Sequence, residues 1–442
     1  MTIISRRAGP RAVPRDASRV DSYLLLVNSA VTAGLGLLYW SLAARLLAPS
    51  DLSMGTAWTT ALVTVSSIGQ LNLFAVLPAV LPSAGPASAG LVRRSYAAAF
   101  TATVLLAVGY AVVAEDLVTA PLPGGLVVAV VTFAAASALW TAFSLQDSVA
   151  AGVRLTWWIP VENAAVSLAK LGLLAAMAPR WGSSAVLVST VTPLLLAVPV
   201  MSLLLRRRLP GVTGRAAREP GRTDQGAPSL LGVGRLAAGD WAGFVLAQVA
   251  GGYLPVLVVT LAGPTPAAAF VAVWAVFAAV DVALGMVVVA MTVHIARDRE
   301  RIRLLVRQTW TRLVVLAVLG LVVVLVAGHA LLGWYAPRYA GSGWPLLTAL
   351  MVGSLPRTVV QVTVGTARAL RRPGVILAIQ AVNAALVLAG AFLAIPVWGP
   401  LGAAVGWAGA QLVCAVLAVT VQRRLLRPAP DAEHSLTQAA IG

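Results

Sequence analysis

Charged residues are scarce in this sequence and make up only 11% of its 442 residues. A soluble globular chain carries roughly 25% charged and about 45–50% apolar residues. Here 59% of the residues are hydrophobic, and the mean hydropathy is +0.89. The shortage of charge therefore excludes a soluble globular protein. It predicts a chain whose main solvent is lipid, crossed by helices of about 20 apolar residues.

Cysteine and histidine are almost missing as well. The single cysteine, Cys414, excludes a disulfide framework, and the three scattered histidines, His294, His329 and His434, do not predict a zinc site. The sequence contains no glycine-rich loop that ends in Gly-Lys-Ser or Gly-Lys-Thr, so we do not expect the chain itself to hydrolyse ATP. Neither a metal nor a cofactor is predicted.

Long apolar stretches are what the sequence has in abundance. Twelve of them run for about 20–28 residues each, which is about 30–40 Å of helix and enough to cross a bilayer. They begin near Ser22, Leu52, Leu91, Leu122, Leu155, Ser183, Leu236, Ala267, Trp310, Trp344, Val375 and Gly399. The predicted fold is an all-α polytopic membrane protein of about twelve transmembrane helices, with both chain ends on the same side.

The basic residues set the orientation of these helices. A net charge of +17 in a soluble protein would point to nucleic acid, but 27 of the 32 basic residues here lie in one alternating set of loops. The other set holds only Arg45, Arg180 and Arg338, while Lys170 and Arg357 lie inside spans. Loops rich in Arg and Lys stay in the cytoplasm. We therefore expect a cell-membrane protein with cytoplasmic termini and no nucleic-acid partner.

Composition also divides the chain into segments. The predicted segments are a basic cytoplasmic arm (1–21), an N-terminal six-helix lobe (22–205), a flexible cytoplasmic linker (206–230), a C-terminal six-helix lobe (231–424) and a disordered cytoplasmic tail (425–442). The linker is rich in Arg, Gly and Pro and falls near the middle of the chain, which prompts a search for an internal repeat.

Three short motifs recur in the two halves at offsets of 215 to 220 residues. They are Pro179-Arg180-Trp181-Gly182 with Pro396-Val397-Trp398-Gly399, Asn163-Ala164-Ala165 with Asn383-Ala384-Ala385, and Ala48-Pro49-Ser50 with Gly263-Pro264-Thr265. A shared offset is not expected of chance matches. It predicts two six-helix lobes related by a pseudo-twofold axis along the membrane normal, with a site between them.

Ionisable residues inside the spans are the candidate site. Each costs several kcal/mol at the midplane unless it faces a cavity or a partner. The candidates for binding are Lys170, Arg357, Glu162 and Asn163, and those for ion coupling or charge balance are Asp281 and Asp240. One interpretation is a cationic cavity for an anionic headgroup. The other is a set of buried ion pairs, such as Lys170 with Asp281, that hold the lobes together. Pro356 is expected to break its helix just before Arg357.

The outer loops argue against an enzyme. A membrane glycosyltransferase or ligase generally needs a sizeable outer loop to hold its donor and acceptor, whereas the outer loops predicted here are mostly shorter than a dozen residues. Their one acidic pair, Glu115-Asp116, has little chain around it and is interpreted as a solvated turn rather than a catalytic pair.

Four segments carry a family resemblance: 28–49, 154–171, 335–340 with Leu355-Pro356-Arg357, and Gly399-Pro400-Leu401-Gly402-Ala403-Ala404. In them the chain resembles the polysaccharide flippases of the multidrug, oligosaccharidyl-lipid and polysaccharide exporter superfamily, with Arg45 at the place of that family's first-helix arginine. Twelve spans suit this family better than the lipid II flippases, which carry two more. The resemblance implies two lobes around a partly cationic cavity, and a polyprenyl-diphosphate-linked oligosaccharide moved from the inner to the outer leaflet by alternating access.

The expected partners are accordingly the lipid-linked oligosaccharide, membrane lipids, and a glycan polymerase with its export machinery. The main alternative is a multidrug extruder of the same superfamily, with an acidic site coupled to protons or sodium. A cationic drug favours an acidic cavity, and Lys170 and Arg357 at mid-membrane argue against it. A membrane glycosyltransferase or ligase is the weaker alternative.

Overall fold

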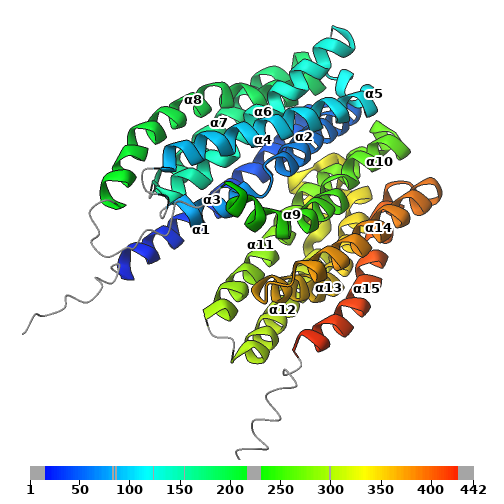
Figure 1. Cartoon of the computed structure of the whole chain (residues 1–442). Coiled ribbons are helices and arrows are strands. Elements are labelled where there is room, and N and C mark those ends of the chain that lie inside the picture. Colours follow the sequence, from blue (N-terminus) through cyan, green and yellow to red (C-terminus); the bar gives the residue numbers. More distant parts are fainter. Residues whose placement is uncertain are drawn as a thin grey trace, which may run out of the picture.

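The protein is all-helical in the part of the chain that its computed structural model describes, residues 15–81, 84, 87–122, 124–153, 155–216, 230–297 and 300–426. Figure 1 shows the helices running roughly side by side as long rods. Those of the first half are α1 (Arg15–Leu46), α2 (Pro49–Gly69), α3 (Leu73–Val80), α4 (Ser88–Val113), α5 (Glu115–Thr119), α6 (Gly125–Gly152), α7 (Trp158–Trp181) and α8 (Ser183–Ala216). Those of the second half are α9 (Leu230–Gly252), α10 (Leu254–Ala262), α11 (Pro264–Arg297), α12 (Ile302–Tyr335), the short 3-10 helix η3 (Pro337–Tyr339), α13 (Ala340–Ala369), α14 (Pro373–Trp398) and α15 (Pro400–Leu425).

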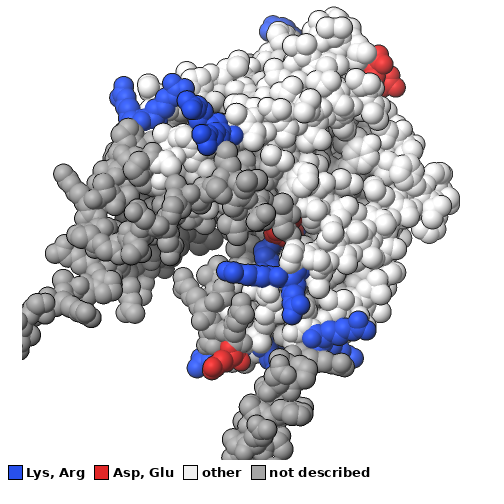
Figure 2. Space-filling model, in the orientation of Figure 1, with Lys and Arg blue, Asp and Glu red and all other residues white. Residues whose placement is uncertain are grey.

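Ten helices within the described residues are long and apolar enough to cross a membrane. This confirms the predicted class of multi-pass all-α membrane protein. Figure 2 shows the corresponding surface: the flanks of the helices are largely uncharged, and most Lys and Arg side chains on this face lie toward the helix ends. The count of twelve crossings stays a prediction, because α1 and α2 are not among the ten.

The low hydropathy of α2 has a structural cause. It carries eight Ser and Thr residues, and twelve of its 21 residues are buried. It packs against helices of both halves, among them α4, α6 and α8 on one side and α9, α10 and α11 on the other. A helix surrounded by protein does not need the apolar surface that lipid requires, so hydropathy alone does not identify it.

The helices form two groups. Helices α1–α8 pack mainly on one another and α9–α15 on one another. The groups meet where α1, α2 and α3 contact α9, α10, α11 and η3. We call the end of the molecule at which α15 ends the inner end, following the orientation that the basic residues predict, and the opposite end the outer end. In Figure 1 the two groups lie close at their outer ends and diverge toward the inner end.

The apolar core follows the same division. One large cluster at the outer ends contains residues of both halves, including Leu47 and Trp58 with Val258 and Phe270. At the inner end each half has separate clusters, one around Leu145 in the first half and two in the second. The halves are therefore joined by a shared core at one end only.

Single glycines connect helices at the outer end. Gly182 joins α7 to α8, Gly263 joins α10 to α11, and Gly399 joins α14 to α15, with φ of +50°, +85° and +58°. L-residues rarely adopt these backbone angles, so the turns depend on glycine. Gly182 and Gly399 also have similar ψ angles, −128° and −142°. The recurring Pro-X-Trp-Gly motif thus has the same local geometry in both halves, as a duplication requires.

Two segment boundaries differ from the sequence prediction. Helix α8 continues to Ala216, so the first part of the predicted linker 206–230 is helical. The Leu and Arg residues at 203–209 are good helix formers that carry the helix past the apolar span, and it continues through Pro210, Gly211 and Gly214. Helix α1 begins at Arg15, inside the predicted arm 1–21. The remaining parts of the predicted arm, linker and tail, residues 1–14, 217–229 and 427–442, lie outside the described residues.

Candidate functional site

A two-point ion pair lies in the middle of the second half. Arg357 on α13 donates from Nε to Oδ1 of Asp281 on α11 at 2.5 Å, and from Nη2 to Oδ2 at 2.8 Å. Both side chains are mostly buried, with 24% and 21% of their surface exposed. A bidentate pair of this kind fixes the plane of the guanidinium as well as its position.

Amide side chains extend this pair across two further helices. Gln361 donates to Oδ1 of Asp281 at 3.0 Å. Nη1 of Arg357 lies 3.5 Å from Oε1 of Gln411 on α15, and Gln411 in turn donates to Asn383 on α14 at 2.9 Å. Asn383 belongs to one of the motifs that recur in the two halves. The network therefore joins α11, α13, α14 and α15 around one arginine.

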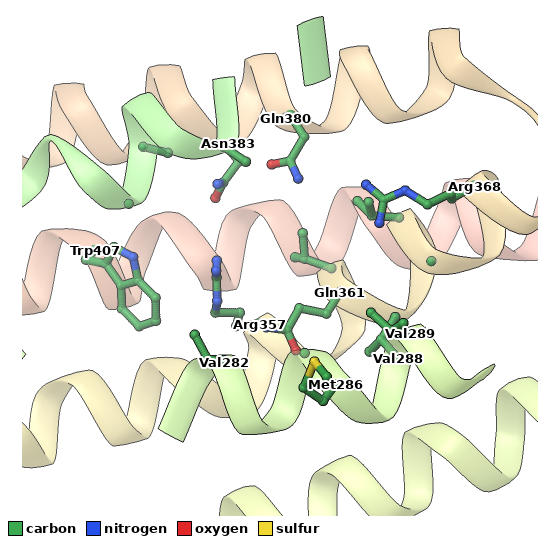
Figure 3. Close-up of a pocket in the computed structure, with 17 residues that line it drawn as sticks. Val282, Met286, Val288, Val289, Arg357, Gln361, Arg368, Gln380, Asn383 and Trp407 are labelled. Carbon is green, nitrogen blue, oxygen red and sulfur yellow. The ribbon is translucent and has the colours of Figure 1, made fainter. Parts of the chain in front are cut away.

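A cavity of about 340 Å³ opens beside this network. Its wall includes Arg357, Gln361, Arg368, Gln380, Asn383 and Trp407. Figure 3 shows the polar side chains of Arg357, Asn383 and Gln380 facing the space between their helices. Asp281 is not part of the wall. Asp281 thus binds the guanidinium of Arg357 without lining the cavity, and Arg357 is the member of the ion pair that lines it.

A second arginine lines the same cavity nearer the inner end. Arg368 donates from Nε to Asp240 on α9 at 2.7 Å and from Nη2 at 3.3 Å, and Asp240 is not part of the cavity wall. Arg368 follows Arg357 by eleven residues on α13. At about 3.6 residues per turn this spacing is close to three full turns, so both arginines lie on one helix face about 16 Å apart along the axis. Each is oriented by an aspartate of another helix.

The first half holds a polar cluster of different character. Asn163 on α7 donates to Oδ2 of Asp147 on α6 at 3.1 Å and to the side-chain oxygen of Asn28 on α1 at 3.2 Å. Both carboxylate oxygens of the neighbouring Glu162 are buried and accept no hydrogen bond from the described residues. The same holds for Oδ1 of Asp147. A buried carboxylate without a donor is stable only when it is protonated, hydrated or bound to a cation.

Lys170 is held by aromatic rings instead of an acid. Its Nζ lies 4.9 Å from the ring centre of Tyr39 on α1 and 5.6 Å from that of Trp140 on α6. It forms no ion pair with any of the described residues. Cation–π contacts orient an ammonium group without neutralising its charge. The Tyr39 ring is itself fixed, since its hydroxyl lies 2.9 Å from Oγ of Ser189.

The comparisons with known proteins place this arrangement in a known fold. The lipid II flippase MurJ, in an inward closed conformation, superposes with a TM-score of 0.66 at 9% identity over 92% of this chain and 90% of that one. A multidrug resistance MATE family transporter of the MOP superfamily, in its inward-facing conformation, gives 0.61 at 13% identity over 90% and 98%. The chain has the fold of the MOP superfamily transporters. No family model and no curated protein matches it in sequence.

A third structure with the same fold is described by the polarity of its own binding pocket. This MOP superfamily transporter from Pyrococcus furiosus is described as having a binding pocket of reversed polarity that suggests a different function. It superposes with a TM-score of 0.56 at 14% identity, over 94% of this chain and 96% of that one.

Within the MOP fold, the six predicted site residues fall into two groups. Arg357, Asp281 and Asp240 lie in the second half, and Glu162, Asn163 and Lys170 lie on α7 in the first. No hydrogen bond or ion pair among the described residues joins the two groups. The suggested pair of Lys170 with Asp281 is wrong, because Asp281 is bound to Arg357 on the adjacent α11–α13 interface.

The predicted break before Arg357 is also wrong. Helix α13 runs without interruption from Ala340 to Ala369, with Pro345 and Pro356 inside it. A proline removes one backbone hydrogen bond, and a helix that is packed on both flanks tolerates that loss. Arg357 is therefore presented by a continuous helix, and its position is set by the packing of α13 on α11 and α15.

The outer ends of the halves are linked by polar contacts of the first helix. Ser41 donates to the carbonyl of Tyr335 at 2.6 Å, and Arg45 donates to the carbonyl of Trp334. From the other side, Arg338 donates to the carbonyl of Leu47 at 3.1 Å. Arg45, the residue that matches the family's first-helix arginine, thus contributes to the closure of the outer end and does not line the cavity described above.

Proposed function

We propose that this chain is a flippase that moves a polyprenyl-diphosphate-linked oligosaccharide from the inner to the outer leaflet by alternating access. The observation that carries the proposal is the wall of the second-half cavity. It contains two arginines, Arg357 at mid-helix and Arg368 near the inner end, while the aspartates that bind them stay outside the wall.

The geometry of Arg357 suits an anion. Its Nε and one N–H of Nη2 are used by Asp281, which leaves the second N–H of Nη2 and the two of Nη1. One of these makes only a long contact of 3.5 Å with Gln411. An anionic ligand in the cavity would receive charge-assisted hydrogen bonds from an arginine whose plane is already fixed. A diphosphate needs such donors, because the cavity offers little water to replace its hydration.

The rest of the wall suits a sugar. Gln361, Gln380 and Asn383 offer amide donors and acceptors. The ring of Trp407 is buried and lies 5.6 Å from the guanidinium of Arg357, which it helps to position. The cavity of about 340 Å³ lies within the range of ligand pockets, which is about 300–1,000 Å³. The headgroup would occupy this cavity, the remaining sugars would lie in the space between the two lobes, and the polyprenyl chain would stay in lipid.

The conformation supports loading from the inner leaflet. The lobes share an apolar core and polar contacts at the outer end and have separate cores at the inner end. A MATE family transporter of this fold is described in both inward-facing and outward-facing conformations. In the proposed cycle the outer contacts of Arg45 and Arg338 break when the inner ends close. A glycan polymerase and its export machinery would then use the product.

A cation-coupled multidrug extruder is the second candidate, and one observation favours it. The cluster of Asp147, Asn163 and Glu162 contains buried carboxylate oxygens without a donor. A proton, a sodium ion or an organic cation would satisfy them. In the flippase proposal this same cluster serves as the coupling site, and the anionic substrate binds in the other lobe.

Equilibrium binding to purified protein separates the two candidates. The probes are a short-chain polyprenyl diphosphate, which is soluble, and ethidium, which is a lipophilic cation. We expect the diphosphate to bind, and Arg357→Gln combined with Asp281→Asn, which leaves no unpaired buried charge, to weaken its binding at unchanged protein yield. Ethidium binding that is lost in Glu162→Gln, with no binding of the diphosphate, would instead establish the extruder.

A further inference from the structure

Two grooves on the outside of the helix bundle lie away from the transport cavity, one in each half. The first, of about 780 Å³, runs between α4 and α8 and has Ala142 of α6 in its floor. The second, of about 280 Å³, runs between α12, α13 and α15. Both lie at the inner ends of their helices, where the basic residues predict the cytoplasmic surface of the membrane.

Arginines line both grooves without carboxylate partners. Arg93 and Arg206 line the first groove, and Arg307 and Arg423 line the second. All four side chains are exposed, and none forms an ion pair with the described residues. Arg303 also lines the second groove, but its guanidinium donates to the carbonyl of Leu426 at 3.2 and 3.0 Å. Each groove therefore offers two arginines that can bind an anion.

Apolar side chains form most of the rest of both walls. In the first groove these include Val92, Phe100, Val198 and Leu205. In the second they include Val306, Trp310, Val359, Val362 and Val419. A soluble phosphate or an acidic peptide has no hydrocarbon chain to bury against such a wall. A molecule with an anionic head and a hydrocarbon chain fits both parts of the groove.

The two grooves occupy equivalent positions in the predicted repeat. Helices α4, α6 and α8 contain the third, fourth and sixth predicted spans of the first half, and α12, α13 and α15 contain the third, fourth and sixth of the second. The side chains that line the two grooves differ, yet both combine a pair of arginines at the inner end with an apolar wall. This second occurrence argues for a shared ligand.

We propose that each groove binds one anionic phospholipid of the inner leaflet. The phosphodiester lies against Arg93 and Arg206 in the first groove and against Arg307 and Arg423 in the second, and an acyl chain lies along the apolar wall. Basic pockets between transmembrane helices on the cytoplasmic side bind anionic headgroups in this way.

The chain contains its own control variants. Arg94, Arg207 and Arg424 directly follow lining arginines in the sequence, are exposed at the same inner end, and do not line the grooves. The double variants Arg93→Gln/Arg206→Gln and Arg307→Gln/Arg423→Gln are compared with Arg94→Gln/Arg207→Gln and with Arg424→Gln. In the first groove the lining pair and its control each remove two charges from the same surface, and in the second the single variant Arg423→Gln is compared with Arg424→Gln. A general loss of attraction to anionic membranes therefore affects lining and control variants alike.

The test is native mass spectrometry of the full chain, purified in detergent and mixed with phosphatidylglycerol or phosphatidylcholine. We expect two retained phosphatidylglycerol molecules in the unaltered protein and one in each lining variant. At about five-fold per arginine, each lining pair should lower the affinity of its groove by about 25-fold, and the controls should retain both lipids. Equal losses in lining and control variants, or equal retention of phosphatidylcholine, would overturn the proposal. Lys in place of Gln should restore most of the binding.

Discussion

Arg357 on α13 and Asp281 on α11 form a two-point ion pair of which only the arginine faces the cavity. Two charges buried together are costly to separate, because the charge that remains has no partner in a medium of low dielectric constant. The same pair can therefore stabilise the fold and present a cation to a ligand. The experiments below distinguish these two roles.

A double-mutant cycle on this pair separates stability from transport. Asp281→Asn leaves a buried arginine without its acid and should cost about 3–5 kcal/mol of folding free energy. Arg357→Gln leaves a lone carboxylate and should cost a similar amount. The double variant should regain much of that stability yet still fail to export glycan, because the cavity has lost its cation. Thermal unfolding in detergent and export in cells are the two measurements; export by a stable double variant would contradict the proposed binding role.

Conservative exchanges test how each cation is used. Arg357→Lys keeps the charge but loses the two-point contact with Asp281, so the affinity for a soluble polyprenyl diphosphate should fall by about 10- to 150-fold. Lys170 lies between two aromatic rings and makes no two-point contact, so Lys170→Arg should lower this affinity less. Isothermal titration measures both. Equal effects of the two exchanges would mean that the planar geometry of Arg357 is unimportant.

Neutralisation of Glu162 tests the polar cluster of the first half. Neither of its carboxylate oxygens has a donor among the described residues, so Glu162→Gln should keep or raise the thermal stability. Asn163→Ala is the contrasting variant, because it removes the donor to Asp147 and should cost about 1–3 kcal/mol. If Glu162→Gln unfolds the protein, the carboxylate has a structural partner and the assignment as a coupling site is wrong.

Alanine at the two equivalent glycines tests the outer turns. Gly399 has open space where a Cβ would stand, so Gly399→Ala should cost only the backbone strain of about 1–3 kcal/mol. A Cβ at Gly182 would also lie 2.9 Å from the carboxylate carbon of Asp51, so Gly182→Ala should be the more destabilising of the two. Unfolding midpoints of both variants, measured side by side, decide the order. A reversed order would mean that Asp51 moves aside at little cost.

Reporter fusions test the orientation. Fusions after Asp224 and at the C-terminus should report cytoplasm, and one after Pro264, at the outer turn before α11, should report the outside. The expectation follows from 27 of 32 basic residues lying in one set of loops. A cytoplasmic signal at Pro264 would remove the orientation used for the inner and outer ends.

Apolar length was the strongest signal in the sequence. Each predicted apolar stretch coincides with a helix or a pair of consecutive helices, because backbone groups in lipid must be satisfied within the segment. Details that depend on local backbone geometry were less accessible. The interruption between α2 and α3, where Leu71 and Asn72 have positive φ, follows from no pattern in the apolar residues.

The partners within the site depended on packing and could not be predicted. Intramembrane position identified Arg357 and Asp281 as candidates, but which acid meets which base depends on how α11 and α13 pack. Asp147 was missed although it satisfies the same rule, since it lies inside an apolar stretch. The amides Gln361 and Gln411 carry no charge, and only the structure brings them to the arginine.

The glycine turns at the outer end have a consequence for any protein that acts on the product. A connection of one residue, as at Gly182, Gly263 and Gly399, has no protruding loop to which an antibody or a soluble glycan-binding protein could bind. If these turns face outward as predicted, a partner that receives the flipped lipid has to approach sideways, within the plane of the bilayer. Such a partner should itself be a membrane protein that contacts the lipid-facing flanks of the helices.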